Sequence, residues 1–257
     1  MKIDINSDLG EGFGIYAAAD DAAIIPLVSS ANIACGFHAG DPVIMDRTVR
    51  LAARHGVDVG AHVGYPDRQG FGRKPFAMDS DELRTMVLYQ LGAMRAITEA
   101  AGTRLSHANF HGALGNLSFV DADVAEVLLR ALHAFDRDLT YVALPGTKAE
   151  TIAQSLGLRV VRSFLADRAY DERGLLVSRG KAGAMVKDPA SIRARIVRLL
   201  REGVVETIEG GTIPMQAQSI LLHSDTPGAV ELGNTIRAAV MEAGADITPM
   251  SQLESGC

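Results

Sequence analysis

The stretch SSANIACGFHAGDP, from Ser29 to Pro42, joins a short apolar run to the start of a helix through a loop that contains one histidine. Ala31–Cys35 within it has the composition of a strand. The residues that follow, DPVIMDRTVRLAARHG, have the pattern of a helix. Asp41 fits the N-cap, Pro42 the first helical position and Gly56 the C-terminal stop. A strand that leads into a helix of this length is half of a βαβ unit.

The same order of strand and helix repeats along the chain, which predicts an α/β protein with a parallel sheet. The sequence leaves open whether the sheet is open and doubly wound or closed into a barrel. We expect one domain over residues 1–257, with an irregular hairpin or lid at Tyr170–Asp188. The predicted strands are Ile3–Asn6, Ala31–Cys35, Val57–His62, Leu105–Phe110, Thr140–Leu144, Arg159–Ala166 and Ser219–His223, and the later helices are Ser80–Ala101, Asp121–Phe135, Lys148–Leu156, Pro189–Glu202 and Pro227–Ala243.

Composition excludes several classes of protein. With 47% hydrophobic residues among 257, the chain has enough apolar surface to fold, which argues against disorder. The excess of 31 acidic over 25 basic residues argues against a nucleic-acid partner. No run of about 18 apolar residues predicts a membrane span, and Asp4 and Asp8 interrupt any signal peptide at the start, so we expect a cytoplasmic protein. The two cysteines, Cys35 and Cys257, make no disulfide framework.

Polar side chains follow the predicted strands at their carboxyl ends. In parallel α/β proteins these ends lie on one face, and that face holds the ligand site. We therefore expect residues from six strands to meet in one cleft although they are scattered along the chain. The residues that would meet are Asp8, His38, His62, His111, Asp167 and His223.

A carboxylate with several imidazoles suits either of two chemistries. It can bind a divalent metal such as Zn, Mn or Ni, with Asp8, His38, His62 and His111 as candidate ligands. It can also catalyse hydrolysis without a metal, with a histidine as base toward water. The sequence has no HExxH, GxSxG or Walker A motif that would decide between them. Cys35 closes an apolar strand, where a buried and unreactive thiol is the commoner outcome.

Some of these polar residues have structural explanations. Asp41 before Pro42, and Asp225 or Thr226 before Pro227, are typical helix caps. His107 alternates with Asn109 and His111 along one strand, so a buried histidine with satisfied hydrogen bonds explains it equally well.

Six longer motifs resemble the LamB/YcsF family, in the correct order and over nearly the whole chain. The resemblance implies a (β/α)7-type barrel like that of polysaccharide deacetylases. It also implies ATP-dependent opening of the 5-oxoproline lactam to glutamate, with ATP as co-substrate and with partner subunits B and C. The motifs are SDLGEGFG (7–14), SSANIACGFHAGDP (29–42), GAHVGYPDRQGFGR (60–73), FHGALGN (110–116), ADRAYDERGLLVSRG (166–180) and HSDTPGAV (223–230).

The sequence departs from the family pattern at several points in these motifs. A usual Lys and Tyr are Asn109 and Gly115, a usual Pro is Val63, and Ser163 and Ser224 replace other usual residues. Asn109 has the largest chemical consequence, because an amide supplies neither the charge nor the acid of a lysine.

The leading hypothesis is therefore a subunit that hydrolyses a cyclic amide. His111 and Asp8 would move protons or position water, His38 and His62 would polarise or bind the substrate, and Arg73 or Arg168 would hold its carboxylate. The alternatives are a metal-dependent amide hydrolase or deacetylase without ATP, and a binding subunit whose catalysis lapsed with Asn109. The full set of site candidates is Asp8, His38, His62, His111 and Asp167 as catalytic residues and Glu11, Asp41, Asp67, Arg73, Arg168, His223 and Asp225 as substrate-binding residues.

Overall fold

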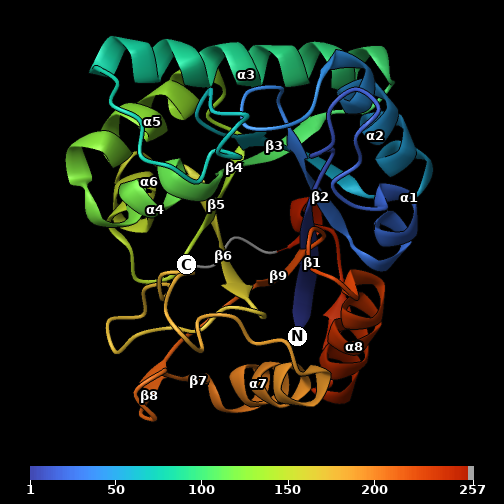
Figure 1. Ribbon diagram of the computed structural model, residues 1–257, viewed down its shortest axis with the longest axis vertical. Coiled ribbons are helices and arrows are strands. Elements are labelled where there is room, and N and C mark those ends of the chain that lie inside the picture. The colour runs from blue at the N-terminus through green and yellow to red at the C-terminus, as the bar shows by residue number, and fades with distance from the viewer. Residues whose placement is uncertain (254–257) are drawn as a thin grey trace.

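The computed structural model describes residues 1–253, and a closed barrel of parallel strands lies at its centre (Figure 1). The strands follow one another around the barrel in chain order, and β9 closes it by pairing with β1. The predicted parallel α/β barrel is confirmed. Its strands are β1 (Lys2–Leu9), β2 (Ser30–Ala34), β3 (Asp58–Val63), β4 (Leu105–Phe110), β5 (Thr140–Ala143), β6 (Arg159–Leu165) and β9 (Ser219–His223).

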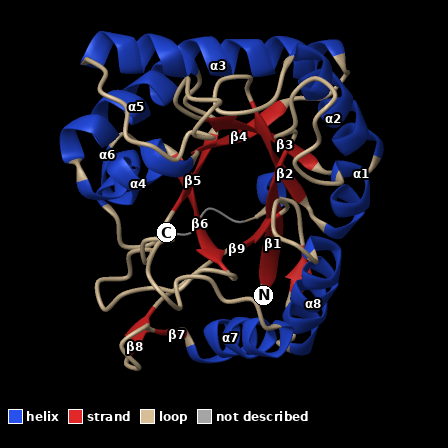
Figure 2. Ribbon diagram, in the orientation of Figure 1, coloured by secondary structure: helices blue, strands red, loops and turns tan. Residues whose placement is uncertain are grey.

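Helices surround the barrel, as the blue ribbons outside the red strands in Figure 2 show. Short 3-10 helices span Ile25–Leu27 and Met250–Gln252, and a two-residue strand β10 (Asp246–Ile247) pairs with the start of β1. A small antiparallel pair, β7 (Val204–Glu206) and β8 (Thr212–Pro214), lies outside the barrel. The helices are α1 (Asp21–Ile24), α2 (Pro42–Arg54), α3 (Ser80–Ala100), α4 (Gly112–Val120), α5 (Ala122–Phe135), α6 (Lys148–Ser155), α7 (Pro189–Glu202) and α8 (Ala229–Glu242).

Most predicted helix starts are confirmed by their caps. The Asp41 carboxylate accepts hydrogen bonds from the backbone N–H groups of Val43 and Ile44. The predicted cap of the last helix is wrong: α8 begins after Gly228, whose φ of 81° is left-handed, and Asp225 pairs with Arg73 instead. Between β1 and β2 the chain forms only α1 and one 3-10 turn.

The interior of the barrel is polar, unlike the apolar layer between the barrel and its helices. The Asp4 carboxylate accepts hydrogen bonds from the hydroxyls of Ser29, Ser30 and Ser219. Above it, the Asn6 side chain donates to Ser219 and accepts from Asn32, and all of these side chains are buried. Burial, the largest effect, raises the pKa of Asp4 to about 6. These side chains form a hydrogen-bonded column that leads to the carboxyl ends of the strands.

Two further expectations concern cysteine and membranes. Cys35 is a buried free thiol whose pKa burial raises to about 12, so it is a poor nucleophile; Cys257 lies outside the described residues. Within residues 1–253, the helices include none with both the length and the apolar character needed to cross a bilayer.

Candidate functional site

A cavity of about 550 Å³ opens where the carboxyl ends of the strands meet. One wall carries charged and imidazole side chains, and the opposite wall, near α4 and β5, is largely apolar. The polar wall includes Asp8, Glu11, His62, Arg73, Asn109, His111, Arg168, Arg179, His223 and Asp225, and the apolar wall includes Phe119, Val120, Val142, Leu144, Leu165 and Leu176.

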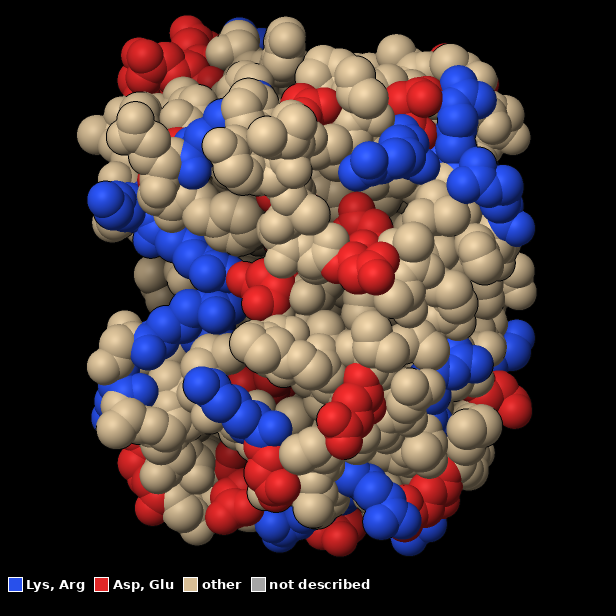
Figure 3. All heavy atoms as spheres, turned by 45° about the vertical axis from the view of Figure 1, so that its right-hand side comes forward, with Lys and Arg blue, Asp and Glu red and all other residues tan. Residues whose placement is uncertain are grey.

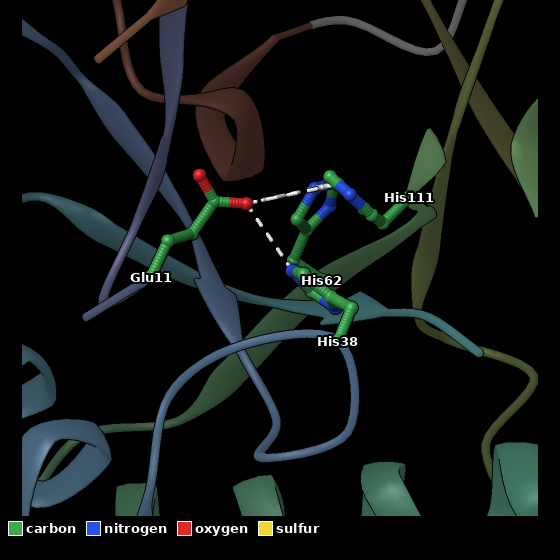
Figure 4. Close-up of side chains that lie close together, drawn as sticks. All are labelled: Glu11, His38, His62 and His111. Carbon is green, nitrogen blue, oxygen red and sulfur yellow. Dashed lines mark hydrogen bonds and ion pairs between the residues drawn. The ribbon is translucent and has the colours of Figure 1, made fainter. Parts of the chain in front are cut away.

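Glu11 and three histidines form a compact cluster in this wall (Figure 4). The Glu11 Oε1 atom lies 3.2 Å from His38 Nε2, 3.8 Å from His62 Nε2 and 3.6 Å from His111 Nδ1. One ligand atom from each of the four residues lies within 4.8 Å of every other, and all four side chains are buried. Four segments that are distant in sequence therefore converge as the strand pattern predicts.

Hydrogen bonds behind the rings direct two lone pairs toward each other. His62 Nδ1 lies 2.6 Å from Asn109 Oδ1 and His111 Nε2 lies 2.8 Å from the Phe71 carbonyl, so each of these nitrogens donates. In the neutral rings the other nitrogens, His62 Nε2 and His111 Nδ1, then present lone pairs to each other at 2.8 Å. Such a contact is repulsive unless a proton or a metal cation occupies it.

The pKa shifts in the cluster favour neutral imidazoles. Burial, followed by the neighbouring ring of His111, lowers the pKa of His38 well below its ordinary value. Burial and His62 lower the pKa of His111 in the same way. Burial and the charge of Asp8 raise the pKa of Glu11 well above its ordinary value. Neutral imidazoles are the form that binds metals. A bound cation would stabilise the ionised Glu11 carboxylate, which burial and Asp8 disfavour.

The donor set fits a divalent metal. Three imidazole nitrogens and one carboxylate oxygen are ligands that Zn²⁺ and related ions prefer. The carboxylate in this set is Glu11, which the sequence suggests as a substrate-binding residue. Asp8, the carboxylate suggested by the sequence, lies at the edge of the cluster, with Oδ2 3.5 Å from His62 Nε2. The geometry thus adds Glu11 to the candidate ligands, and Asp8 stays a candidate that also lines the cavity.

The backbone approaches His38 closely at Gly64 and at Gly72. A Cβ at Gly64 would lie 2.4 Å from His38 Nδ1. Gln90 of α3 fixes this stretch, because its side chain accepts from the Gly64 N–H and donates to the Gly64 carbonyl, both at 3.0 Å. His38 stacks on His111 with ring centroids 3.9 Å apart. The His38 ring is therefore held from two sides.

A second polar group lies in the same wall, on the neighbouring strand β9. His223 Nδ1 lies 2.8 Å from Asp167 Oδ1 and donates to this buried carboxylate, and His223 Nε2 lies 3.4 Å from Arg179 Nη2. Burial raises the pKa of Asp167, but the charge of His223 and its hydrogen bond outweigh it and lower the pKa overall. A carboxylate that orients an imidazole in this way is suited to proton transfer.

The structure places the remaining candidates in different roles. Arg73 forms an ion pair with Asp225, with Nη2 2.7 Å from Oδ2, at the rim of the cavity. Arg168 is buried and its Nη2 donates to the Val177 carbonyl at 2.6 Å. Asp41 caps α2, and Asp67 accepts a hydrogen bond from the Gly70 N–H within its own loop. Neither Asp41 nor Asp67 is among the described residues that line the cavity.

Sequence reasoning missed three residues that shape the site. Arg179 reaches the cavity from the irregular segment predicted at 170–188, which forms part of its wall. Asn32 donates to Asp8 Oδ1 at 2.9 Å, and the Phe71 carbonyl accepts from His111. Asn32 lies two positions before Ala34 in the predicted strand, so alternation along β2 was a signal for its inward direction.

Comparison with known proteins agrees with the motifs. The family model described as the LamB/YcsF family matches residues 3–255. The chain belongs to the LamB/YcsF family. It is similar over nearly all of its length to relatives whose names describe them as the A subunit of 5-oxoprolinase. One from Pseudomonas syringae pv. tomato is 54% identical, covering 98% of this chain and 99% of the relative, and one from Ralstonia nicotianae is 55% identical, covering 98% and 97%.

Two solved structures are similar to this LamB/YcsF protein. The crystal structure of the lactam utilization protein from Thermus thermophilus superposes with a TM-score of 0.92 at 42% identity, covering 97% of this chain and 100% of that one. A putative cellobiose-phosphate cleavage protein from Enterococcus faecalis shares the fold, with a TM-score of 0.57 at 12% identity, covering 96% and 97%.

Proposed function

We propose that this chain is a cytoplasmic subunit of a 5-oxoprolinase that opens the lactam ring of 5-oxoproline to glutamate, with partner subunits B and C and with consumption of ATP. The names of its relatives support a role with lactams or 5-oxoproline and a place among several subunits. The observation that carries the proposal is that the cluster of Glu11 and three histidines and the His223–Asp167 pair both present side chains to one cavity.

The chemistry explains the need for ATP. An amide carbonyl resists water because its nitrogen donates electrons into it. Transfer of the γ-phosphoryl group of ATP to the carbonyl oxygen makes the carbonyl carbon electrophilic. One water then adds, the C–N bond breaks and its nitrogen takes up a proton. A second water hydrolyses the resulting acyl phosphate to glutamate and inorganic phosphate.

The residues of this chain have distinct roles in this scheme. Asp8 faces the cavity beside His62 and is placed to accept a proton from the attacking water. His223, held at Nδ1 by Asp167, would first take up a proton at Nε2 and then donate it to the departing nitrogen. Glu11, His38, His62 and His111 would hold a divalent metal, which when bound supplies Lewis acidity toward the carbonyl oxygen.

Reconstitution tests this function directly. Purified chain, subunits B and C, ATP and 5-oxoproline should release glutamate, and omission of any one component should stop the release. The variant Asp167→Asn should lower kcat by about 100-fold with little change in KM, because it removes the orientation of His223 without altering the cavity shape. An active ATPase complex that releases no glutamate would contradict the proposal.

A metal-dependent amide hydrolase without ATP is the second candidate, and the facing lone pairs of His62 and His111 favour it. The two candidates differ in what glutamate release requires. Release that persists without ATP and stops on chelation would support the second candidate over the first.

A further inference from the structure

We propose that Arg179 forms, with Arg168, an anion subsite that binds the carboxylate of the lactam and selects carboxylated lactams over neutral ones. The inference rests on the proposed function and deepens it, because it names the group that decides substrate class. It also changes which arginine holds the carboxylate, since the sequence suggests Arg73 or Arg168 for this role.

Arg73 is already neutralised. Its Nη2 lies 2.7 Å from Asp225 Oδ2, and its guanidinium packs over the Phe71 ring, 4.8 Å from the centroid. A carboxylate ligand at Arg73 would have to compete with Asp225. Arg73 therefore fits the rim of the site better than the anion position.

Arg179 lacks such a partner within the part of the chain that the structure describes. Its polar contacts are His223 Nε2 at 3.4 Å from Nη2 and the Met185 sulfur at 3.7 Å from Nη1. Neither contact carries a negative charge, and no Asp or Glu among residues 1–253 forms an ion pair with Arg179. Figure 3 shows basic side chains on both sides of a hollow at the left edge of the view. A guanidinium that lines a cavity without a carboxylate partner is suited to bind a carboxylate.

Arg168 adds a second positive charge below Arg179. Its side chain is buried, and its Nε has no hydrogen-bond partner among the described residues. Burial, followed by the charge of Arg179, lowers the pKa of Arg168 to about 10, and a bound anion would favour the charged form of both side chains. Arg195 holds the backbone here by donating to the Ala166 and Arg168 carbonyls.

His223 is a neighbour of both Asp8 and Arg179. Asp8 and His223 are partners in the pairing of β1 and β9, so their backbones are one strand spacing apart, about 4.8 Å. In 5-oxoproline the carboxylate is on the ring carbon next to the nitrogen, on the side opposite the carbonyl carbon. In the proposed orientation the carbonyl is near Glu11 and Asp8 and the carboxylate is on the side of Arg179, whose Nη2 lies 3.4 Å from His223 Nε2.

Binding of two lactams tests this inference. Titration calorimetry of the full chain with 5-oxoproline and with 2-pyrrolidinone, which lacks the carboxylate, should show tighter binding of 5-oxoproline. Arg179→Gln should lower the affinity for 5-oxoproline by about 10- to 100-fold, since one charge-assisted contact is lost. The affinity for 2-pyrrolidinone should not change. The affinity of Arg179→Lys for 5-oxoproline should lie between those of the wild-type chain and Arg179→Gln. Arg173→Gln is the matched control, because Arg173 is in the same segment and does not line this cavity.

The outcomes separate this inference from the proposed function. Equal affinity of Arg179→Gln and Arg173→Gln for 5-oxoproline would overturn the anion subsite and leave the lactam function standing. An equal loss for both lactams would also overturn it, because a damaged fold or cavity does not discriminate between them. Failure of the wild-type chain to bind either lactam, together with no glutamate release by the complex, would contradict the proposed function itself.

Discussion

His62 and His111 face each other with Nε2 and Nδ1 2.8 Å apart, while the opposite nitrogen of each ring donates a hydrogen bond away from this contact. Two neutral imidazoles do not share a contact of this kind without a cation. The arrangement is what outer hydrogen bonds produce around a metal, where they orient each ring and increase its basicity.

The first prediction concerns metal content. Purified chain loaded with Zn²⁺ should hold about one equivalent, and Glu11→Gln or His38→Gln should lower the metal affinity by about 100-fold or more, since each removes a ligand. Elemental analysis after dialysis measures this. His133→Gln is the control, because His133 lies on α5 outside the cluster. The same metal content in Glu11→Gln and in His133→Gln would show that the cluster is not the binding site.

The second prediction concerns Asn109, which accepts a hydrogen bond from His62 Nδ1 at 2.6 Å. Asn109→Leu should weaken metal binding by about 10- to 100-fold, because the His62 ring loses its outer partner. Asn109→Asp keeps an acceptor and should retain metal. Competition with a chromophoric chelator gives both affinities. If the two variants bind metal equally, the hydrogen bond does not orient His62.

The third prediction concerns the close approach of Gly64 to His38. Gly64→Ala should displace the His38 ring, since the new Cβ would lie 2.4 Å from Nδ1, and so lower metal affinity. Gly92→Ala in α3 meets no described atom within 4 Å and should raise the free energy of unfolding by up to about 1 kcal/mol. Metal titration measures the affinity of each variant, and urea denaturation measures its free energy of unfolding. Unchanged metal affinity in Gly64→Ala would mean that His38 is not a ligand.

The fourth prediction concerns stability and pH. The pKa of Asp4 in the folded chain is about 6, above its ordinary value of 3.8, so the folded state keeps a proton that the unfolded state releases. The free energy of unfolding should therefore fall as the pH rises from about 4 to 6, by up to about 3 kcal/mol, and then level off. Asp4→Asn should remove this decrease, as measured by urea denaturation between pH 4 and 7.

A matched variant controls this prediction. Asp138→Asn changes an exposed carboxylate and should keep the decrease between pH 4 and 6. A decrease of the same size in Asp4→Asn would assign it to another group.

The sequence predicts the barrel strands well because each is a short apolar run that ends in a glycine or a polar residue. It does not predict α4, since Gly112 and Gly115 make the stretch after β4 look like a loop. Nor does the sequence show whether Glu11 or Asp8 is the carboxylate that lies among the three histidines. The difference depends on the turn at Gly10, whose φ of 68° brings Glu11 back toward the histidines. Asp41 and Asp67 lie in polar motifs that suggest site residues, but each carboxylate accepts a hydrogen bond from a nearby backbone N–H group, and this local role explains its position.

The division of the cavity into two unlike walls has a consequence for evolution and engineering. Among the lining side chains, Phe119, Leu144 and Leu176 are apolar and belong to none of the proposed catalytic groups. They can be exchanged for smaller or larger residues without disturbing the hydrogen-bonded column beneath the opposite wall. Variation there would let one reaction centre accept rings of different size, so libraries that seek new lactam substrates should begin with these three positions.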